Sequence, residues 1–230
     1  MTDRLAAIIE NLNDAGARRD LSKVKDSLIR ALDEIRTILR EASPGVDKTR
    51  VYCFGFFLRA LLDHEVLKEK TSKKNWHKDA KLVESVWTIL CDAATRLDEA
   101  QFVVRGPAFE RVTKFFNYLA NFYVRKFGPG MYTSPDILVR KSSCTICGQS
   151  IKACSHIPGR VYDGKKCQEK LEDMELLSVS MVANPEDPRC RIWPWYVRKG
   201  ESRIADVPII MFSTFDDFLR DDNWTNRLTK

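Results

Sequence analysis

The chain has 230 residues, of which 44% are hydrophobic, and a formal net charge of +6. This length allows one large domain or two small ones, and the apolar content is sufficient for an ordinary core. The sequence lacks a run of about 18 apolar residues, which argues against a membrane-spanning helix, and the early charges at Asp3 and Arg4 argue against a signal peptide. We therefore expect a cytoplasmic protein without membrane association, in which seven cysteines indicate metal binding rather than disulfides.

The first half of the chain has helical periodicity. Apolar residues that recur every three or four positions predict helices at 2–13, 20–42, 48–70, 79–104 and 107–127. Asp20 and Asp47 are predicted to be N-caps, and Pro107 suits the first turn of a helix.

One apolar stripe runs along the helix expected at 20–42, formed by Leu21, Val24, Leu28, Leu32, Ile35 and Leu39. We expect this stripe to pack on neighbouring helices of the same chain, because it spans only about three heptads. The alternative is that the N-terminal helices form the contact of a homo-oligomer.

The strongest break in the chain is Gly128-Pro129-Gly130, where we place a domain boundary. Short apolar runs follow, which predict strands at 137–139, 176–182, 191–197 and 207–212, and a short amphipathic helix through Arg220. The predicted fold is therefore α+β, with a helical bundle at 1–128 and a small zinc-stabilised mixed α/β module at 131–230.

A cluster of potential metal ligands lies within this second part. It comprises a Cys-x-x-Cys-Gly turn, a Cys-x-His pair and a later cysteine, namely Cys144, Cys147, Cys154, His156 and Cys167. Because tetrahedral Zn²⁺ takes four cysteine or histidine ligands, the spacing predicts a zinc site with one candidate too many. We favour Cys144 and Cys147 with His156 and Cys167; Cys154 is the alternative to either of the last two.

The predicted zinc site is more typical of a structural site than of a catalytic one. Catalytic zinc usually has three protein ligands and a water, whereas here the protein can fill all four positions. The sequence also lacks His-Glu-x-x-His and the His-x-Glu signature of zinc deaminases. We therefore expect a protein that is not an enzyme, with a zinc-dependent hydrolase or nuclease as an alternative.

Residues 140–170 carry seven basic and two acidic side chains, a local charge of +5. Such a patch could bind nucleic-acid phosphates through Arg140, Lys141, Lys152, Arg160, Lys165 and Lys166. Trp193, Trp195 and Tyr196 are then candidates for stacking on bases. The alternative is that the basic side chains only solvate a loop-rich module and the aromatic ones belong to a core.

Three motifs follow one another here: Cys-x-x-Cys-Gly at 144–148, Cys-x-His-x-Pro-Gly at 154–159 and Tyr-x-Gly-Lys-x-Cys at 162–167. Together they resemble a zinc-binding module of tailed-phage head-assembly proteins, including prohead-protease-like chains. The stretches 179–185 and 189–192 are similar to a later part of the same chains. The resemblance implies a small β-containing domain in which these five Cys and His residues bind metal. It does not extend to a protease domain, so protease activity is not implied.

These observations together favour a non-enzymatic zinc-binding interaction or adaptor protein, related to phages or mobile elements. In this hypothesis a structural zinc holds a surface that recognises a protein partner. The main alternative is nucleic-acid binding by the basic module.

Overall fold

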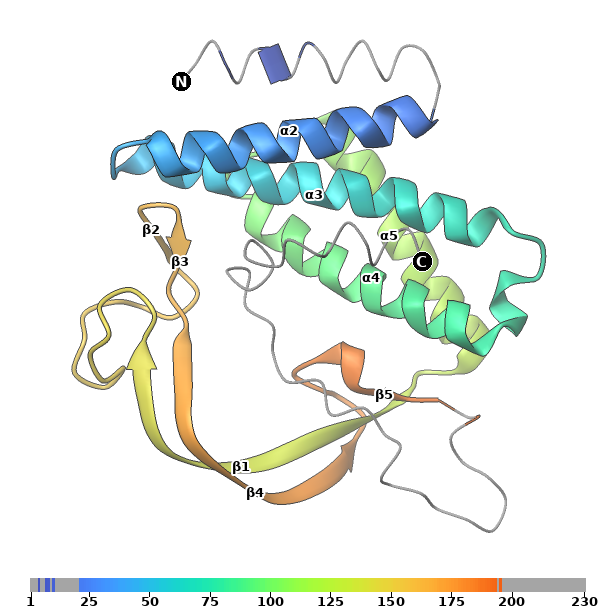
Figure 1. Ribbon diagram of the computed structural model, residues 1–230. Coiled ribbons are helices and arrows are strands. Elements are labelled where there is room, and N and C mark those ends of the chain that lie inside the picture. The colour runs from blue at the N-terminus through green and yellow to red at the C-terminus, as the bar shows by residue number, and fades with distance from the viewer. Residues whose placement is uncertain (1–3, 5–6, 9, 11–20, 194, 196–230) are drawn as a thin grey trace.

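The computed structural model describes residues 4, 7, 8, 10, 21–193 and 195 (Figure 1). Four long helices form the first part: α2 (Leu21–Glu41), α3 (Val46–Ser72), α4 (Ala80–Ala100) and α5 (Pro107–Phe127). They agree with four of the predicted helices, and residues 4, 7, 8 and 10 of the predicted first helix are also helical. None of the helices within these ranges combines the length and apolar character needed to cross a bilayer.

The start of α3 differs from the prediction. Gly45 is the N-cap residue, with φ of 147°, and no side chain caps the first turn. Asp47 lies inside that turn instead, where its charge is favourable to the helix dipole. Pro107 does lie in the first turn of α5, as predicted, whereas Asp20 lies outside the described residues.

The apolar stripe of α2 packs against α3. Leu28, Leu32 and Ile35 are buried in one cluster with residues of α3. At the crossing, a Cβ on Gly55 would lie 3.1 Å from Cγ2 of Ile35, so the absence of a side chain lets the helices approach closely. The stripe is therefore used inside the chain, as expected.

The second part of the described chain is built around a long antiparallel ribbon. Strand β1 (Met131–Cys144) pairs with β4 (Glu169–Val182) from Tyr132 to Cys144, and with the short β5 (Arg191–Ile192) at its start. The sheet order is β4-β1-β5. Helices followed by an antiparallel sheet confirm the predicted α+β class.

The strand predictions were correct in place but not in length. The runs 137–139 and 176–182 are parts of two strands of 14 residues each. Among the described residues of the run 191–197, Arg191–Ile192 forms a strand, and the following Trp193 stacks on Trp195 with ring centroids 5.1 Å apart. The predicted strand 207–212 and the helix after it lie outside the described residues.

The base of the ribbon shares the core of the helices. Tyr132 and Trp193 belong to the large apolar cluster that α3, α4 and α5 also form. Between them lies Arg191, which is buried, stacks over Trp87 and Trp193, and donates to the carbonyl oxygen of Gly128 at 2.8 Å. The domain boundary at Gly128-Pro129-Gly130 stays a prediction, but side-chain packing crosses it.

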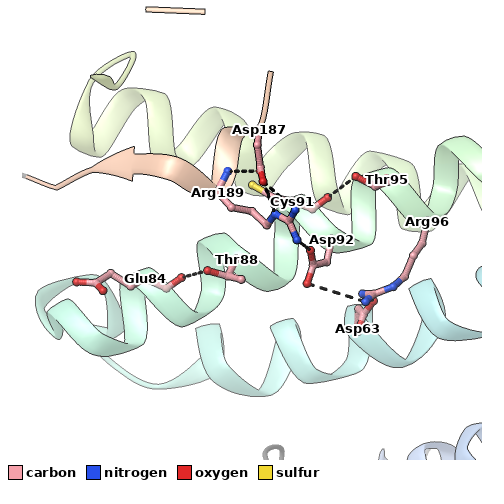
Figure 2. Close-up of polar contacts among 9 residues, drawn as sticks. All are labelled: Asp63, Glu84, Thr88, Cys91, Asp92, Thr95, Arg96, Asp187 and Arg189. Carbon is pink, nitrogen blue, oxygen red and sulfur yellow. Dashed lines mark hydrogen bonds and ion pairs between the residues drawn. The ribbon is translucent and has the colours of Figure 1, made fainter. Parts of the chain in front are cut away.

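A partly buried polar network fastens the segment before β5 to the helices (Figure 2). Arg189, in the short helix η2 (Pro188–Cys190), donates to Asp92 of α4 at 3.1 Å. One turn along α4, Arg96 pairs with Asp63 of α3. Asp92 and Arg96 lie 3.9 Å apart on α4, so these partly buried charges join η2, α4 and α3.

The close approach at Gly130 leads to a prediction about stability. Gly128 and Gly130 both have positive φ, at 79° and 91°, so alanine strains the backbone at either position. Only at Gly130 would a new Cβ collide with other atoms, 2.9 Å from Oη of Tyr132 and 3.0 Å from Cζ of Arg191. We expect Gly130→Ala to lower the free energy of unfolding by about 2–4 kcal/mol and Gly128→Ala by about 1 kcal/mol. Chemical denaturation measures both, and equal losses would contradict the role of the close approach.

Candidate metal centre

The Cys and His cluster lies at the end of the ribbon that is remote from β5. Cys144 is the last residue of β1 and pairs with Glu169, the first residue of β4 (Figure 1). The connection between them contains only one small hairpin, β2 (Val161–Tyr162) and β3 (Lys165–Lys166). A loop with so little regular structure requires another source of order, such as a metal.

Four of the predicted ligands converge. The ligand atoms of Cys144, Cys147, Cys154 and His156 all lie within 4.8 Å of one another. In a tetrahedral site with Zn–S bonds of about 2.3 Å, neighbouring sulfur atoms are about 3.8 Å apart. The group therefore has the composition and nearly the dimensions of a site for one metal ion.

The fifth candidate, Cys167, is adjacent to this group. Its side chain is fully buried and its Sγ atom is 3.7 Å from Sγ of Cys144. The structure thus brings all five predicted residues to one place, but the group of four contains Cys154 where the sequence favoured Cys167.

A tight turn positions the first two cysteines. The backbone N–H of Gly148 donates to the carbonyl oxygen of Cys144 at 2.8 Å, and Gly148 has a φ of 73°, as the Cys-x-x-Cys-Gly motif predicts. Within the turn, the N–H of Ile146 points at Sγ of Cys144 at 3.4 Å. Such N–H···S contacts stabilise a thiolate, the form in which cysteine binds metal.

The thiols of the cluster differ in acidity. Burial raises the pKa of Cys144, but the N–H groups of Cys147 and Ile146 and the neighbouring thiols outweigh it and bring this pKa down to about 6. Burial and the adjacent Cys144 raise the pKa of Cys154 and bring that of Cys167 to about 11. At neutral pH Cys144 is therefore largely a thiolate, whereas Cys154 must lose a proton to bind a metal.

This order predicts a pH dependence of metal affinity. Because Cys154 must lose a proton and its pKa is raised, protons compete with the metal and the affinity increases with pH. We expect an increase of at least about tenfold per pH unit between pH 6 and 8, since at least one proton is released. Zinc titrations in buffers with different ionisation enthalpies measure the protons released, and a pH-independent affinity would contradict thiol ligation.

His156 has an unsatisfied nitrogen. Its Nδ1 atom is buried and has no hydrogen-bond partner among the described residues, although buried polar atoms are nearly always paired. A bound cation at the cluster would supply the missing partner. The edge of the ring packs on Tyr162, with centroids 4.8 Å apart, and Oη of Tyr162 accepts a hydrogen bond from the N–H of Ile157. Tyr162 thereby holds the turn that carries the histidine.

Thr145 joins the two halves of the loop. Its Oγ1 donates to the carbonyl oxygen of Lys166 at 3.2 Å and accepts from the N–H of Gln168 at 2.8 Å. Its own N–H donates to the carbonyl oxygen of Gln168. Sequence reasoning missed Thr145 and Tyr162, because a threonine between two cysteines and a tyrosine near a turn have no signature of their own.

The hairpin of the loop returns to the helices (Figure 1). Its turn is Asp163-Gly164, with φ of 50° and 73°, as suits a two-residue hairpin. A Cβ on Gly164 would lie 2.9 Å from Cγ of Lys48 at the start of α3, and Lys166 pairs with Glu99 of α4. The loop is therefore attached to the bundle at a second point, away from the base of the ribbon.

Most of the predicted nucleic-acid contacts have other partners. Arg140, Lys141 and Lys166 form ion pairs with acidic residues of β4 or α4. Lys165 also has an electrostatic or hydrogen-bond partner. Lys152 and Arg160 are exposed and have no ion pair within the described part of the chain.

The predicted stacking residues are also engaged. Trp193 is buried in the core, and Nε1 of Trp195 donates to Glu84 at 2.6 Å. Tyr196 lies outside the described residues.

Comparison with protein-family models, curated proteins and solved structures finds no match to this chain. The geometry of the cluster is therefore the basis for a functional proposal.

Proposed function

We propose that this chain is a non-enzymatic interaction protein whose loop 144–168 is held in shape by one structural Zn²⁺. The ligands are Cys144, Cys147, Cys154 and His156. The observation that carries the proposal is the convergence of these four ligand atoms within 4.8 Å, with the sulfur of Cys167 beside them. Such a set leaves no coordination position for water or substrate, which argues against the hydrolase alternative.

The choice of zinc over other metals follows from the donors. Thiolates and imidazole in a tetrahedral arrangement suit Zn²⁺, whereas Ca²⁺ and Mg²⁺ prefer oxygen. A single ligating histidine does not match the two histidines of a Rieske cluster. All seven cysteines are free thiols, which supports a reducing compartment and hence the cytoplasm.

The metal has a clear mechanical role in this proposal. The loop joins the ends of two 14-residue strands, and a two-stranded ribbon is only marginally stable by itself. An ion that binds Cys144 at the end of β1 and His156 in the loop fixes both the ribbon end and the loop surface. That surface is the proposed contact for a protein partner, and the phage-like motifs make a phage or mobile-element assembly the proposed setting.

The ligand assignment is tested by two matched serine substitutions. We expect Cys154→Ser to lose stoichiometric zinc, whereas Cys167→Ser retains one zinc per chain with about tenfold lower affinity, the effect of losing a residue that only supports a ligand. Metal analysis after dialysis against a weak chelator distinguishes them. The reverse result would place Cys167 in the coordination sphere, and zinc retention by both variants would reject the four-ligand set.

A second candidate function rests on Lys152 and Arg160, which project from the loop without ion pairs in the described residues. Two such charges can contribute to binding of nucleic-acid phosphates. In that case affinity for single-stranded or duplex DNA falls steeply with salt, and a double substitution by alanine weakens it equally for all sequences. Binding that is absent at about 50 mM salt would reject this candidate.

A further inference from the structure

The β1–β4 ribbon has one mainly polar side and one apolar face. Cross-strand partners share a face, so the register places Leu138 and Glu175 on the polar side, where Glu175 forms an ion pair with Arg140, two residues beyond Leu138. The other side carries a continuous apolar row that we call the apolar ribbon face: Pro135, Ile137, Val139, Met174, Leu176, Val179 and Met181.

This apolar ribbon face is largely open to solvent. Leu176 is 53% exposed and Met181 is 72% exposed, while Ile137 and Val139 are half-buried. The ribbon extends away from the helices between its base and the metal loop (Figure 1). An amphipathic two-stranded ribbon normally needs a second layer over its apolar side, and within the described residues no element provides one.

The size of the face argues against a second copy as its cover. Fully burying an aliphatic side chain removes on the order of 100 Å² of apolar surface, so seven partly exposed ones offer roughly 300–400 Å². Stable protein–protein contacts bury about 800 Å² on each partner. An occupant that belongs to the same chain does not need that area, because its effective concentration is already high.

The remainder of the chain contains one segment with the required character. The chain continues for 35 residues after Trp195 (230 − 195), and the longest apolar run there is Val-Pro-Ile-Ile-Met-Phe at 207–212. The described chain stops beside the ribbon base, where Arg191–Ile192 pairs with Met131 and Tyr132.

The connection is long enough for this segment to reach the face. Eleven residues lie between Trp195 and Val207, and this connection spans up to about 40 Å when extended. From Met174 to Met181 the strand rises only about 25 Å.

We propose that the run Val207–Phe212 packs on the apolar ribbon face of its own chain. The ribbon then gains a second apolar layer in cis, and its open side is withdrawn from contact with other molecules. The proposal does not depend on the metal or on the partner of the loop, because it concerns a different surface.

Photo-crosslinking in the full chain tests the proposal. A benzoylphenylalanine placed at Met181 should form a cross-link within the same chain to the peptide that contains 207–212, at a yield independent of protein concentration. At Ser178, an exposed position that pairs with Asp136 on the polar side of the same strand, the yield should be at least fivefold lower. Cross-links from Met181 to a second copy, to another segment, or to none would each overturn the proposal.

A substitution in the segment gives an independent readout. The double variant Ile209→Asp, Ile210→Asp should expose the apolar ribbon face and raise the fluorescence of a hydrophobic dye such as anilinonaphthalene sulfonate at least twofold. The matched control Thr229→Asp adds a charge outside the run and should leave the fluorescence unchanged. Equal fluorescence of the double variant and the parent chain would contradict the packing, and the zinc content serves to show that the metal loop is unaffected.

Discussion

Cys144→Ser is expected to abolish high-affinity metal binding and to loosen the ribbon end. Cys144 is the member of the group that lies inside regular structure, at the last residue of β1, and its pKa is lowered to about 6. Serine has nearly the same size but is a poor zinc ligand, so the loss reports ligation and not packing. We expect affinity to fall by more than the 10–100-fold that is typical of residues that only orient a ligand.

The expected structural consequence is local. Amide hydrogen exchange should accelerate in the loop 145–168 and at its flanking strand ends, while α3 and α4, which have their own core, should keep their protection. Ser150→Ala is a suitable control, because Ser150 lies in the same loop, is exposed and is not a ligand candidate. Unchanged cobalt or zinc affinity in Cys144→Ser would contradict the proposed metal site. Amide exchange that accelerates equally in the helices would show that the effect is not local.

The second large effect is expected at Asp63. Its side chain is 3% exposed and lies between two arginines, Arg59 of α3 at 3.2 Å and Arg96 of α4. Asp63→Asn keeps the shape of the side chain but removes the negative charge that both arginines contact, while Arg96 keeps a longer contact with Asp92 at 3.9 Å. Breaking a buried ion pair in this way costs about 3–5 kcal/mol, so we expect a loss of unfolding free energy of that size.

The pKa of Arg59 supports this expectation. Burial brings it down to about 10 even though Asp63 lies beside it, so the site already disfavours a positive charge. The matched control is Asp33→Asn, which removes an exposed pair with Arg36 within α2 and should change stability by less than about 1 kcal/mol. Urea denaturation measures both variants; comparable losses would mean that Asp63 contributes no more than a surface charge.

The helical part of this fold could be predicted because its signal is local. The apolar stripe of α2 repeats at helical spacing and is buried against α3 as that spacing implies. The first residue of α3 could not be predicted in the same way, because both Gly45 and Asp47 are possible N-cap residues. The structure has Gly45 as the N-cap, with a backbone φ of 147°. The ion pairs of Asp63, Arg96 and Arg189 were not predicted either, because the partners in each pair are distant in sequence.

The candidate site was predictable in composition but not in detail. Spacing identified the five Cys and His residues, because a short loop brings nearby sulfur atoms together whatever the rest of the chain does. The choice between Cys154 and Cys167 depends on how the loop folds back over Thr145, which no local pattern encodes. The full length of the two ribbon strands was not predicted either. The polar and the apolar side of the ribbon can be recognised only when the pairing of β1 with β4 is known.

X-ray absorption spectroscopy of the purified full chain tests the central claim most directly. The account predicts one zinc per chain with three sulfur atoms at about 2.3 Å and one nitrogen at about 2.0 Å, and no oxygen ligand. A chain that purifies without stoichiometric metal and does not take up zinc, or a zinc that retains a water ligand, would contradict a closed structural site.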